Sequence, residues 1–131
     1  MQNMNRKELS EYWITSSNGD FKTMNNLFKS RDYHWSLFIG HLVIEKLLKA
    51  YYAVVMTNDV PFTHDLLRIA EMCKLDLTND KKDLLDLITT FNIKARYDDY
   101  KMEFYKKCTR KFTSQAVKKI TEFRKWLKKQ F

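Results

Sequence analysis

The chain has 131 residues, a length that one domain with a single buried core accounts for. It contains only two glycines and one proline, which favours helices over turn-rich β structure. Aromatic residues make up 15% of the chain, which excludes a disordered chain. The formal net charge of +8 arises from residues 94–131, where 13 Lys or Arg accompany 4 Asp or Glu, so this part either binds a polyanion or presents a solvated basic face.

The first predicted helix covers residues 6–29. Its apolar residues recur at mostly three- or four-residue spacings, as one buried stripe requires: Leu9, Trp13, Phe21, Met24, Leu27 and Phe28. Gly19 costs only about 1 kcal/mol inside a helix, and the stripe stays in phase across it. We therefore expect one long helix rather than two.

The second predicted helix, residues 33–56, is apolar on almost every side and is expected to be the central one. Its exception is a polar strip formed by His41, Glu45 and Lys49, which recur every four residues. The strip is either a salt-bridged line facing water or the polar wall of a cleft. We favour the solvent-facing line, because charged helical strips usually serve solubility, and we expect His41 to be an ordinary member of it.

Two shorter helices are predicted after a turn at residues 58–62. Thr63 or Asp65 caps the first, which carries Leu66, Leu67, Ile69, Ala70 and Cys73. Residues 78–80 cap the next, which extends to about Phe91 with Leu84, Leu87, Ile88 and Phe91 on its buried face.

Residues 92–111 have no long period and are predicted to form a loop with one helical turn near residues 102–105. The last helix is predicted to begin at Thr113 as its N-cap, with Phe112 and Val117 as a hydrophobic staple. Its buried stripe is Ala116, Ile120, Phe123 and Leu127. The other faces carry the candidate polyanion surface: Lys118, Lys119, Arg124, Lys125, Lys128 and Lys129. These cations also suit the C-terminal end of the helix dipole.

Cys73 and Cys108 occur without a CxxC or Cys/His spacing, so neither a metal site nor a disulfide framework is predicted. We expect buried, reduced thiols in a cytoplasmic protein. Residues 1–8 contain no apolar stretch, and the apolar run at 35–56 is interrupted by charges, so neither a signal peptide nor a membrane span is expected. The prediction is one helical domain over residues 1–131, with no cofactor.

Three segments occur in an informative order: IEKLLKA at residues 44–50, PFTHDL at residues 61–66, and ARYDD at residues 95–99. Together they resemble the HEPN domain family, whose name stands for higher eukaryotes and prokaryotes nucleotide-binding. The resemblance implies an up-and-down bundle of four or five helices that forms a homodimer. It also implies a partnership with a small nucleotidyltransferase in a toxin–antitoxin pair.

Some members of this family are ribonucleases that use an Arg followed, four to six residues later, by a His. In this chain the residues at those distances from Arg96 are Lys101, Met102 and Glu103, and every histidine precedes Arg96. Cleavage at a ribose 2′-OH needs a group that exchanges a proton near neutral pH, which histidine does best. We therefore expect binding without catalysis, and assign no catalytic residue. Asp98 replaces the proline of the commoner ARYPD form, which predicts a looser loop.

The candidate nucleotide or phosphate site contains Glu45, Lys49, His64, Arg96, Tyr97 and Asp99. Arg96 either holds a phosphate, oriented by Asp99 or Glu45, or belongs with both to an ion-pair network that fixes the loop, and we favour the network. Tyr97 and Tyr100 could stack on a base, but packing against the bundle is the simpler expectation. His64 is expected to help cap a helix.

Three functions remain open at this stage. The first is a non-catalytic module that binds nucleotide or RNA and acts with a separately encoded nucleotidyltransferase. The second is a metal-independent ribonuclease toxin with a degenerate site. The third is a structural dimerisation or adaptor domain.

Overall fold

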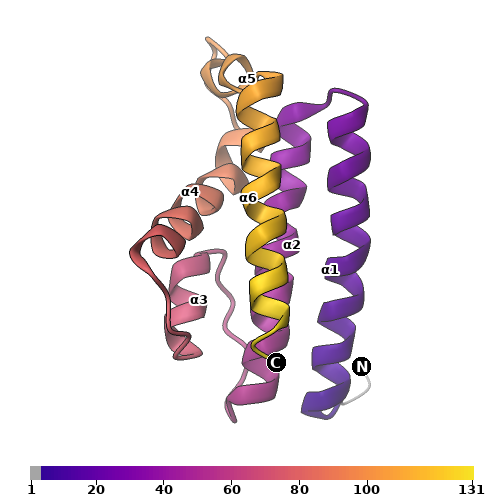
Figure 1. The fold of residues 1–131 in the computed structure, drawn as a ribbon, viewed down its shortest axis with the longest axis vertical. Coiled ribbons are helices and arrows are strands. Elements are labelled where there is room, and N and C mark those ends of the chain that lie inside the picture. Colours follow the sequence, from indigo (N-terminus) through magenta and orange to yellow (C-terminus); the bar gives the residue numbers. More distant parts are fainter. Residues whose placement is uncertain (1–3) are drawn as a thin grey trace.

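The computed structural model describes residues 4–131, which form six α-helices and no β-strand (Figure 1). The helices are α1 (Arg6–Lys29), α2 (Tyr33–Val55), α3 (Leu66–Met72), α4 (Asn79–Arg96), α5 (Glu103–Lys107) and α6 (Arg110–Lys128). Helices α1, α2 and α6 lie side by side along the long axis, and α3 and α4 cover another side of α2. The predicted all-helical bundle is confirmed. No helix within residues 4–131 is long and apolar enough to cross a membrane.

Buried serines hold α1 and α2 together as an antiparallel pair. Each serine donates its hydroxyl hydrogen to a carbonyl of the facing helix, in the pairs Ser10 to Ala50, Ser17 to Val43, and Ser36 to Met24. Successive pairs are seven residues apart on both helices, the repeat of helices that pack at a shallow angle. The small side chains allow close approach, and the bonds satisfy hydroxyls that would be costly to bury unpaired. The heptad spacing thus sets the register of the hairpin.

Helix α2 is the centre of the core, as predicted, because it contacts α1, α3, α4 and α6. Gly40 marks its closest packing: a Cβ atom there would lie 2.7 Å from Cδ1 of Ile120 on α6 and 3.1 Å from Sδ of Met24 on α1. At Gly19, by contrast, a Cβ would meet nothing within 4 Å, and α1 continues through this position. The prediction of one unbroken first helix is confirmed.

The predicted end of the fourth helix is wrong, and its predicted buried face is correct only at Ile88 and Phe91. Helix α4 continues to Arg96, one and a half turns beyond Phe91, because no glycine or proline stops it. Its buried residues are Leu85, Ile88, Phe91, Asn92 and Ala95. Leu84 is half-buried, and Leu87 is exposed. The predicted face was therefore rotated toward α4's exposed side, where Leu84 and Leu87 line a groove.

The predicted start of the last helix is also wrong. Helix α6 begins one turn earlier, with Thr109 as its N-cap: the Thr109 hydroxyl oxygen accepts a hydrogen bond from the backbone N–H of Phe112. Thr113 is fully buried inside the helix, so Phe112 and Val117 do not form a staple. Both threonines are acceptable caps, and nothing in residues 110–112 disfavours helix, so the earlier cap prevails.

Asp98 organises the connection between α4 and α6, contrary to the expectation of a looser loop. Its carboxylate accepts hydrogen bonds from the backbone N–H groups of Asp99, Phe104 and Tyr105. Desolvation opposes ionisation of this group, but these donors hold the pKa of Asp98 below its usual value. Asp98 thereby anchors α5, the helical turn predicted near residues 102–105.

Candidate functional site

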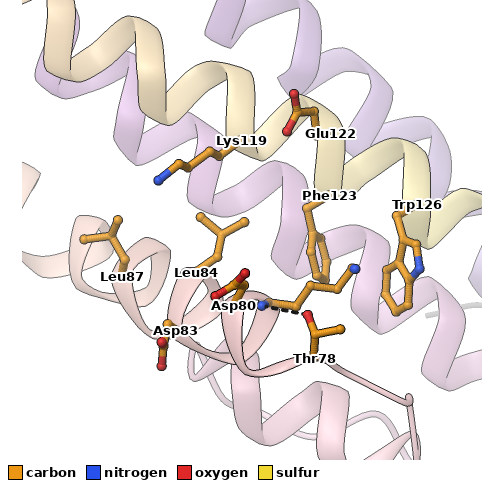
Figure 2. A pocket seen from close by; sticks show the side chains of 10 residues that line it. Thr78, Asp80, Asp83, Leu84, Leu87, Lys119, Glu122, Phe123 and Trp126 are labelled. Carbon is orange, nitrogen blue, oxygen red and sulfur yellow. Dashed lines mark hydrogen bonds between the residues drawn. The ribbon is translucent and has the colours of Figure 1, made fainter.

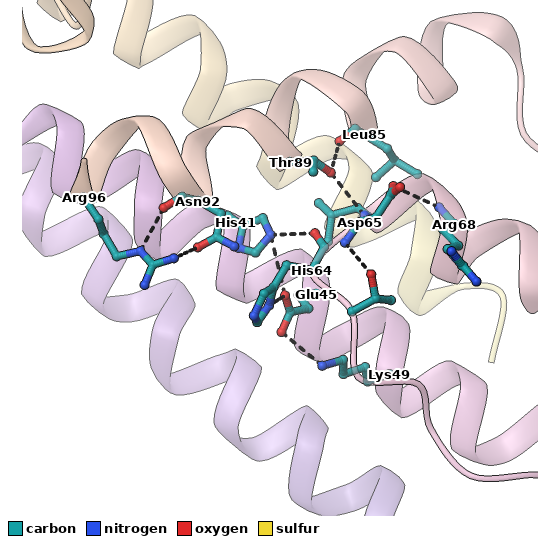
Figure 3. A network of polar contacts seen from close by, with 12 residues as sticks. His41, Glu45, Lys49, His64, Asp65, Arg68, Leu85, Thr89, Asn92 and Arg96 are labelled. Atoms are coloured by element: carbon teal, nitrogen blue, oxygen red, sulfur yellow. Dashed lines mark hydrogen bonds and ion pairs between the residues drawn. The ribbon is translucent and has the colours of Figure 1, made fainter. Parts of the chain in front are cut away.

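The polar strip of α2 is buried, so the solvent-facing arrangement predicted for it is wrong. His41, Glu45 and Lys49 have 0%, 5% and 7% of their surface exposed. The loop between α2 and α3 folds back over the strip and places His64 against it (Figure 3). These four residues, His41, Glu45, Lys49 and His64, form a buried polar cluster. The strip is closed within the fold, so it forms neither a solvent-facing line nor the wall of an open cleft.

Glu45 is the centre of the buried polar cluster. Its Oε1 atom lies 2.6 Å from Nδ1 of His64, and its Oε2 atom lies 3.2 Å from Nζ of Lys49. Both carboxylate oxygens are therefore used by cationic or N–H groups of the same chain. A charge this deeply buried is tolerable only when it is paired in this way.

His41 forms a hydrogen bond with the loop that carries His64. Its Nε2 atom lies 3.1 Å from the backbone carbonyl oxygen of His64, to which it donates in the Nε2–H tautomer, and 3.6 Å from Oε1 of Glu45. Burial lowers the pKa of His41 below its usual value, which favours the neutral ring at pH 7. A neutral His41 serves as a structural hydrogen-bond donor within one chain.

His64 does not cap α3, contrary to the prediction. Asp65 does so, because its side chain accepts a hydrogen bond from the N–H of Arg68. The His64 side chain is instead 64% exposed, while Nδ1 is held by Glu45. In the Nδ1–H tautomer, Nε2 is the hydrogen-bond acceptor of this largely exposed ring. The cluster thus presents one oriented imidazole on the surface.

Lys49 and Glu45 are not available to a ligand in this arrangement. The Lys49 ammonium is held by Glu45 and lies 5.6 Å from the centre of the Trp13 ring of α1. Of the three cluster residues assigned to the candidate nucleotide site, only His64 reaches the surface. The other two support it.

Arg96 belongs neither to an ion-pair network with Glu45 and Asp99 nor to the buried polar cluster. Its Nε and Nη2 atoms donate to the backbone oxygen and the side-chain oxygen of Asn92, 2.9 and 2.8 Å away. The guanidinium lies over the rings of Phe38 and Tyr97. Within residues 4–131 Arg96 makes no salt bridge, since Asp99 accepts from the N–H of Glu103 and Glu45 is otherwise engaged. The favoured network prediction is wrong.

Tyr97 and Tyr100 are exposed, so the expectation that they pack against the bundle is wrong. Tyr97 retains 70% of its accessible surface and Tyr100 retains 91%. Tyr97 follows the last residue of α4, and the Arg96 guanidinium lies 5.1 Å from the centre of its ring. The two tyrosines are available to stack with a ligand.

The basic surface of α6 has two parts. Arg124 lies 3.9 Å from the centre of the Phe21 ring, and both Arg124 and Lys128 donate to the side-chain oxygen of Asn18 on α1. Burial lowers the pKa of both groups. Lys118, Lys119, Lys125 and Lys129 are exposed. Arg124 and Lys128 therefore help to attach α6 to α1, and the remaining four are free to meet an anion.

A groove of about 820 Å³ lies between α4 and α6 (Figure 2). It is lined by Thr78, Asp80, Lys81, Asp83, Leu84, Leu87, Lys119, Glu122, Phe123 and Trp126. Lys81 lies 4.8 Å from the centre of the Trp126 ring, and Thr78 is committed to capping α4. The lining contains no His, Cys or Arg and shares no residue with the buried polar cluster. It offers a mixed surface without a proton-transfer group near neutral pH.

Sequence reasoning missed the roles of Trp13, Asn92 and Asp98. Asn92 had a detectable signal: it lies four residues before Arg96, a spacing at which helical side chains meet. Asp98 had none, because it lies five residues before Glu103, the first residue of α5, and Met102 occupies the N-cap position at which such an acceptor is expected. Cys73 and Cys108 are free and buried, as expected, and burial raises their pKa values to about 12 and 11. Neither thiol is activated.

A family model described as HEPN domain matches residues 10–130. The match spans α1 to α6 and includes the buried polar cluster, Arg96 and both exposed tyrosines. No match was found among curated proteins or among solved structures.

Proposed function

We propose that this chain, which belongs to the HEPN domain family, is a non-catalytic module that binds nucleotide or RNA. In this proposal it acts in the cytoplasm with a separately encoded nucleotidyltransferase, as one half of a toxin–antitoxin-type pair. The family match and the resemblance of its three segments support the nucleotide-related role, and the absence of a histidine after Arg96 supports binding without cleavage.

The observation that carries the proposal is the uncompensated positive charge of residues 94–131. The segment holds 13 Lys or Arg. The salt bridges within residues 4–131 involve only His41, Lys46, Lys49 and His64 as cations, so none of these 13 side chains is neutralised by a carboxylate. Unpaired cations on one part of a surface attract a polyanion, and the polyanion releases its bound counterions when it binds there.

Purified protein is expected to bind single-stranded RNA at low salt and to leave it intact. Fluorescence anisotropy of a labelled oligonucleotide measures binding, and denaturing gel electrophoresis of the same samples, with chelator present, measures cleavage. Saturable binding with no product over hours agrees with the proposal. Absence of binding at low salt would instead leave the adaptor function.

A ribonuclease function has one specific observation in its favour, the exposed His64 imidazole held by Glu45 at 2.6 Å. A carboxylate that orients an imidazole is a common arrangement for general base catalysis. This alternative predicts metal-free cleavage that is lost in His64→Ala and reduced in Arg96→Ala. Cleavage that survives in both variants comes from a contaminating nuclease.

A homodimer in solution is a separate part of the proposal. The apolar central helix offers no surface for it, because α1, α3, α4 and α6 of the same chain cover α2. Exposed apolar side chains remain at Trp35 and Ile93, with 41% and 62% of their surface exposed. Burial of such side chains between two copies favours self-association.

Analytical ultracentrifugation at micromolar concentration is expected to show twice the chain mass of 15.9 kDa. Ile93→Lys should shift the equilibrium toward monomer, because it places a charge where an exposed apolar side chain is proposed to be buried between the two copies. The matched variant Val54→Lys, at an exposed apolar position near the far end of α2, should leave the dimer unchanged. A wild-type monomer over the whole concentration range would contradict this part of the proposal.

A further inference from the structure

We propose that the bases of single-stranded RNA stack on Tyr97 and Tyr100, while Lys94, Lys106 and Lys107 hold the adjoining phosphates. These five residues are named the tyrosine–lysine platform. The inference rests on the proposed RNA-binding function and assigns it to the end of α4 and to α5, away from the buried polar cluster.

The aromatic half of the platform is built for contact with a planar ligand. Tyr97 and Tyr100 retain 70% and 91% of their surface, although large aromatic side chains are normally mostly buried. The Arg96 guanidinium lies over the Tyr97 ring, and its own position is fixed by two hydrogen bonds to Asn92. The Tyr97 ring therefore has a guanidinium of fixed position beside it. Stacking on aromatic rings tolerates any base, because every base has a π face.

The cationic half of the platform lines a groove. The groove has a volume of about 650 Å³, within the range of small-ligand sites, and Tyr97 lines it together with Lys94, Lys106 and Lys107. Ring and ammonium groups thus border the same space, as one nucleotide requires for its base and its phosphate.

Three carboxylates, those of Asp98, Asp99 and Glu103, also line the groove and keep their negative charge, but none of them is paired with a lysine in the described part of the chain. The Asp98 carboxylate accepts hydrogen bonds from three backbone N–H groups, and the Asp99 carboxylate accepts one from the backbone N–H of Glu103. No salt bridge within residues 4–131 includes Asp98, Asp99 or Glu103. The two aspartates serve the backbone of α5, which leaves Glu103 as the one uncommitted carboxylate beside three unpaired lysines.

Single-stranded RNA fits this surface better than a duplex does. The bases of a duplex are stacked on one another inside the helix and cannot reach an exposed tyrosine, whereas those of a single strand are accessible. The platform therefore predicts a preference for single strands, which an exposed lysine face alone would not produce.

The test compares binding of three fluorescent probes by anisotropy at low salt: an eight-nucleotide RNA, the same RNA annealed to its complement, and a polyphosphate chain of similar charge. Tyr97→Ala/Tyr100→Ala is expected to weaken single-strand binding by about 25-fold, from a factor of about five for each of the two lost stacking contacts. Polyphosphate binding should be unchanged, since that probe has no bases. The matched variant Tyr97→Phe/Tyr100→Phe keeps both rings and should bind within about twofold of wild type.

In Lys94→Gln/Lys106→Gln/Lys107→Gln, the slope of log affinity against log salt concentration is expected to become less steep by up to about 2. The tyrosine variants should keep the wild-type slope. Wild-type RNA binding that is unchanged in Tyr97→Ala/Tyr100→Ala, or equal for duplex and single strand, would overturn the platform and leave the proposed function intact. A wild-type protein that binds no RNA would overturn both. Circular dichroism of each variant confirms that the fold is retained, as expected for exposed positions.

Discussion

Replacing Glu45 with alanine is expected to destabilise the protein by about 3–5 kcal/mol, a large part of the stability of a domain of this size. The loss is measured by urea unfolding followed by circular dichroism at pH 7. This substitution removes the shared partner of Lys49 and His64. Lys49 would then be an ammonium group that is 7% exposed and has no anion beside it.

The large effect follows from burial and not from the mere presence of an ion pair. Asp20 and Lys46 form a second pair with a 2.7 Å separation, but each side chain is 21% exposed, so water shares the solvation of both charges. Asp20→Asn is expected to cost no more than about 1 kcal/mol. Comparison of the two substitutions separates buried from hydrated ion pairs in the same protein.

A double substitution tests the mechanism of the loss. Glu45→Leu/Lys49→Met removes both charges and fills their space with apolar atoms, so the protein should recover most of the stability lost in Glu45→Ala. His64, which is 64% exposed, can pass its Nδ1–H bond to water. A double variant no more stable than Glu45→Ala would show that the carboxylate, and not the unpaired ammonium, is the essential group.

Most of the fold was predictable because helix periodicity and caps are local properties. The α1 stripe remained in phase across Gly19, and Asp65 and Thr78 cap α3 and α4 as their side chains allow. Predicted helix boundaries were wrong where two residues were equally good caps, as Thr109 and Thr113 are for the start of α6. The buried face of α4 was predicted only in part, because its leucines lie on both sides of the helix. Only the position of α2 determines that Leu85 is the buried one.

The site was less predictable, because its contacts join distant parts of the chain. A four-residue spacing shows that His41, Glu45 and Lys49 share a face, but not that residues 56–65 cover that face. His64 reaches Glu45 across 19 positions. For Arg96, opposite charge suggested Glu45 or Asp99 as partners, yet the Asn92 oxygens one turn earlier were closer. Local hydrogen bonds and aromatic contacts thus outcompeted the expected ion pairs.

If the basic face of α6 contacts RNA, affinity should fall steeply as salt rises. For a single strand, log affinity changes by about −0.7 per log unit of salt for each phosphate neutralised. Contact with four phosphates therefore predicts a loss of about 50-fold between 50 and 200 mM salt. Anisotropy titrations across this range measure the slope directly.

Lys118→Gln/Lys125→Gln/Lys129→Gln is expected to flatten this slope by up to about 2, with a corresponding loss of affinity at low salt. All three side chains are exposed and share one side of the helix, and none belongs to the buried stripe of α6. Arg124 and Lys128 are left in place because their contacts with α1 contribute to folding.

The control variant Lys7→Gln/Lys22→Gln/Lys29→Gln removes the same charge from exposed positions on α1. Long-range attraction depends on total charge, so this control reports how much of the effect any three lysines produce. A binding face on α6 requires a clearly larger change in slope for the α6 variant than for the α1 control. Equal changes would mean that α6 contributes only to the net charge of the protein, and the platform at the end of α4 would then account for the phosphate contacts.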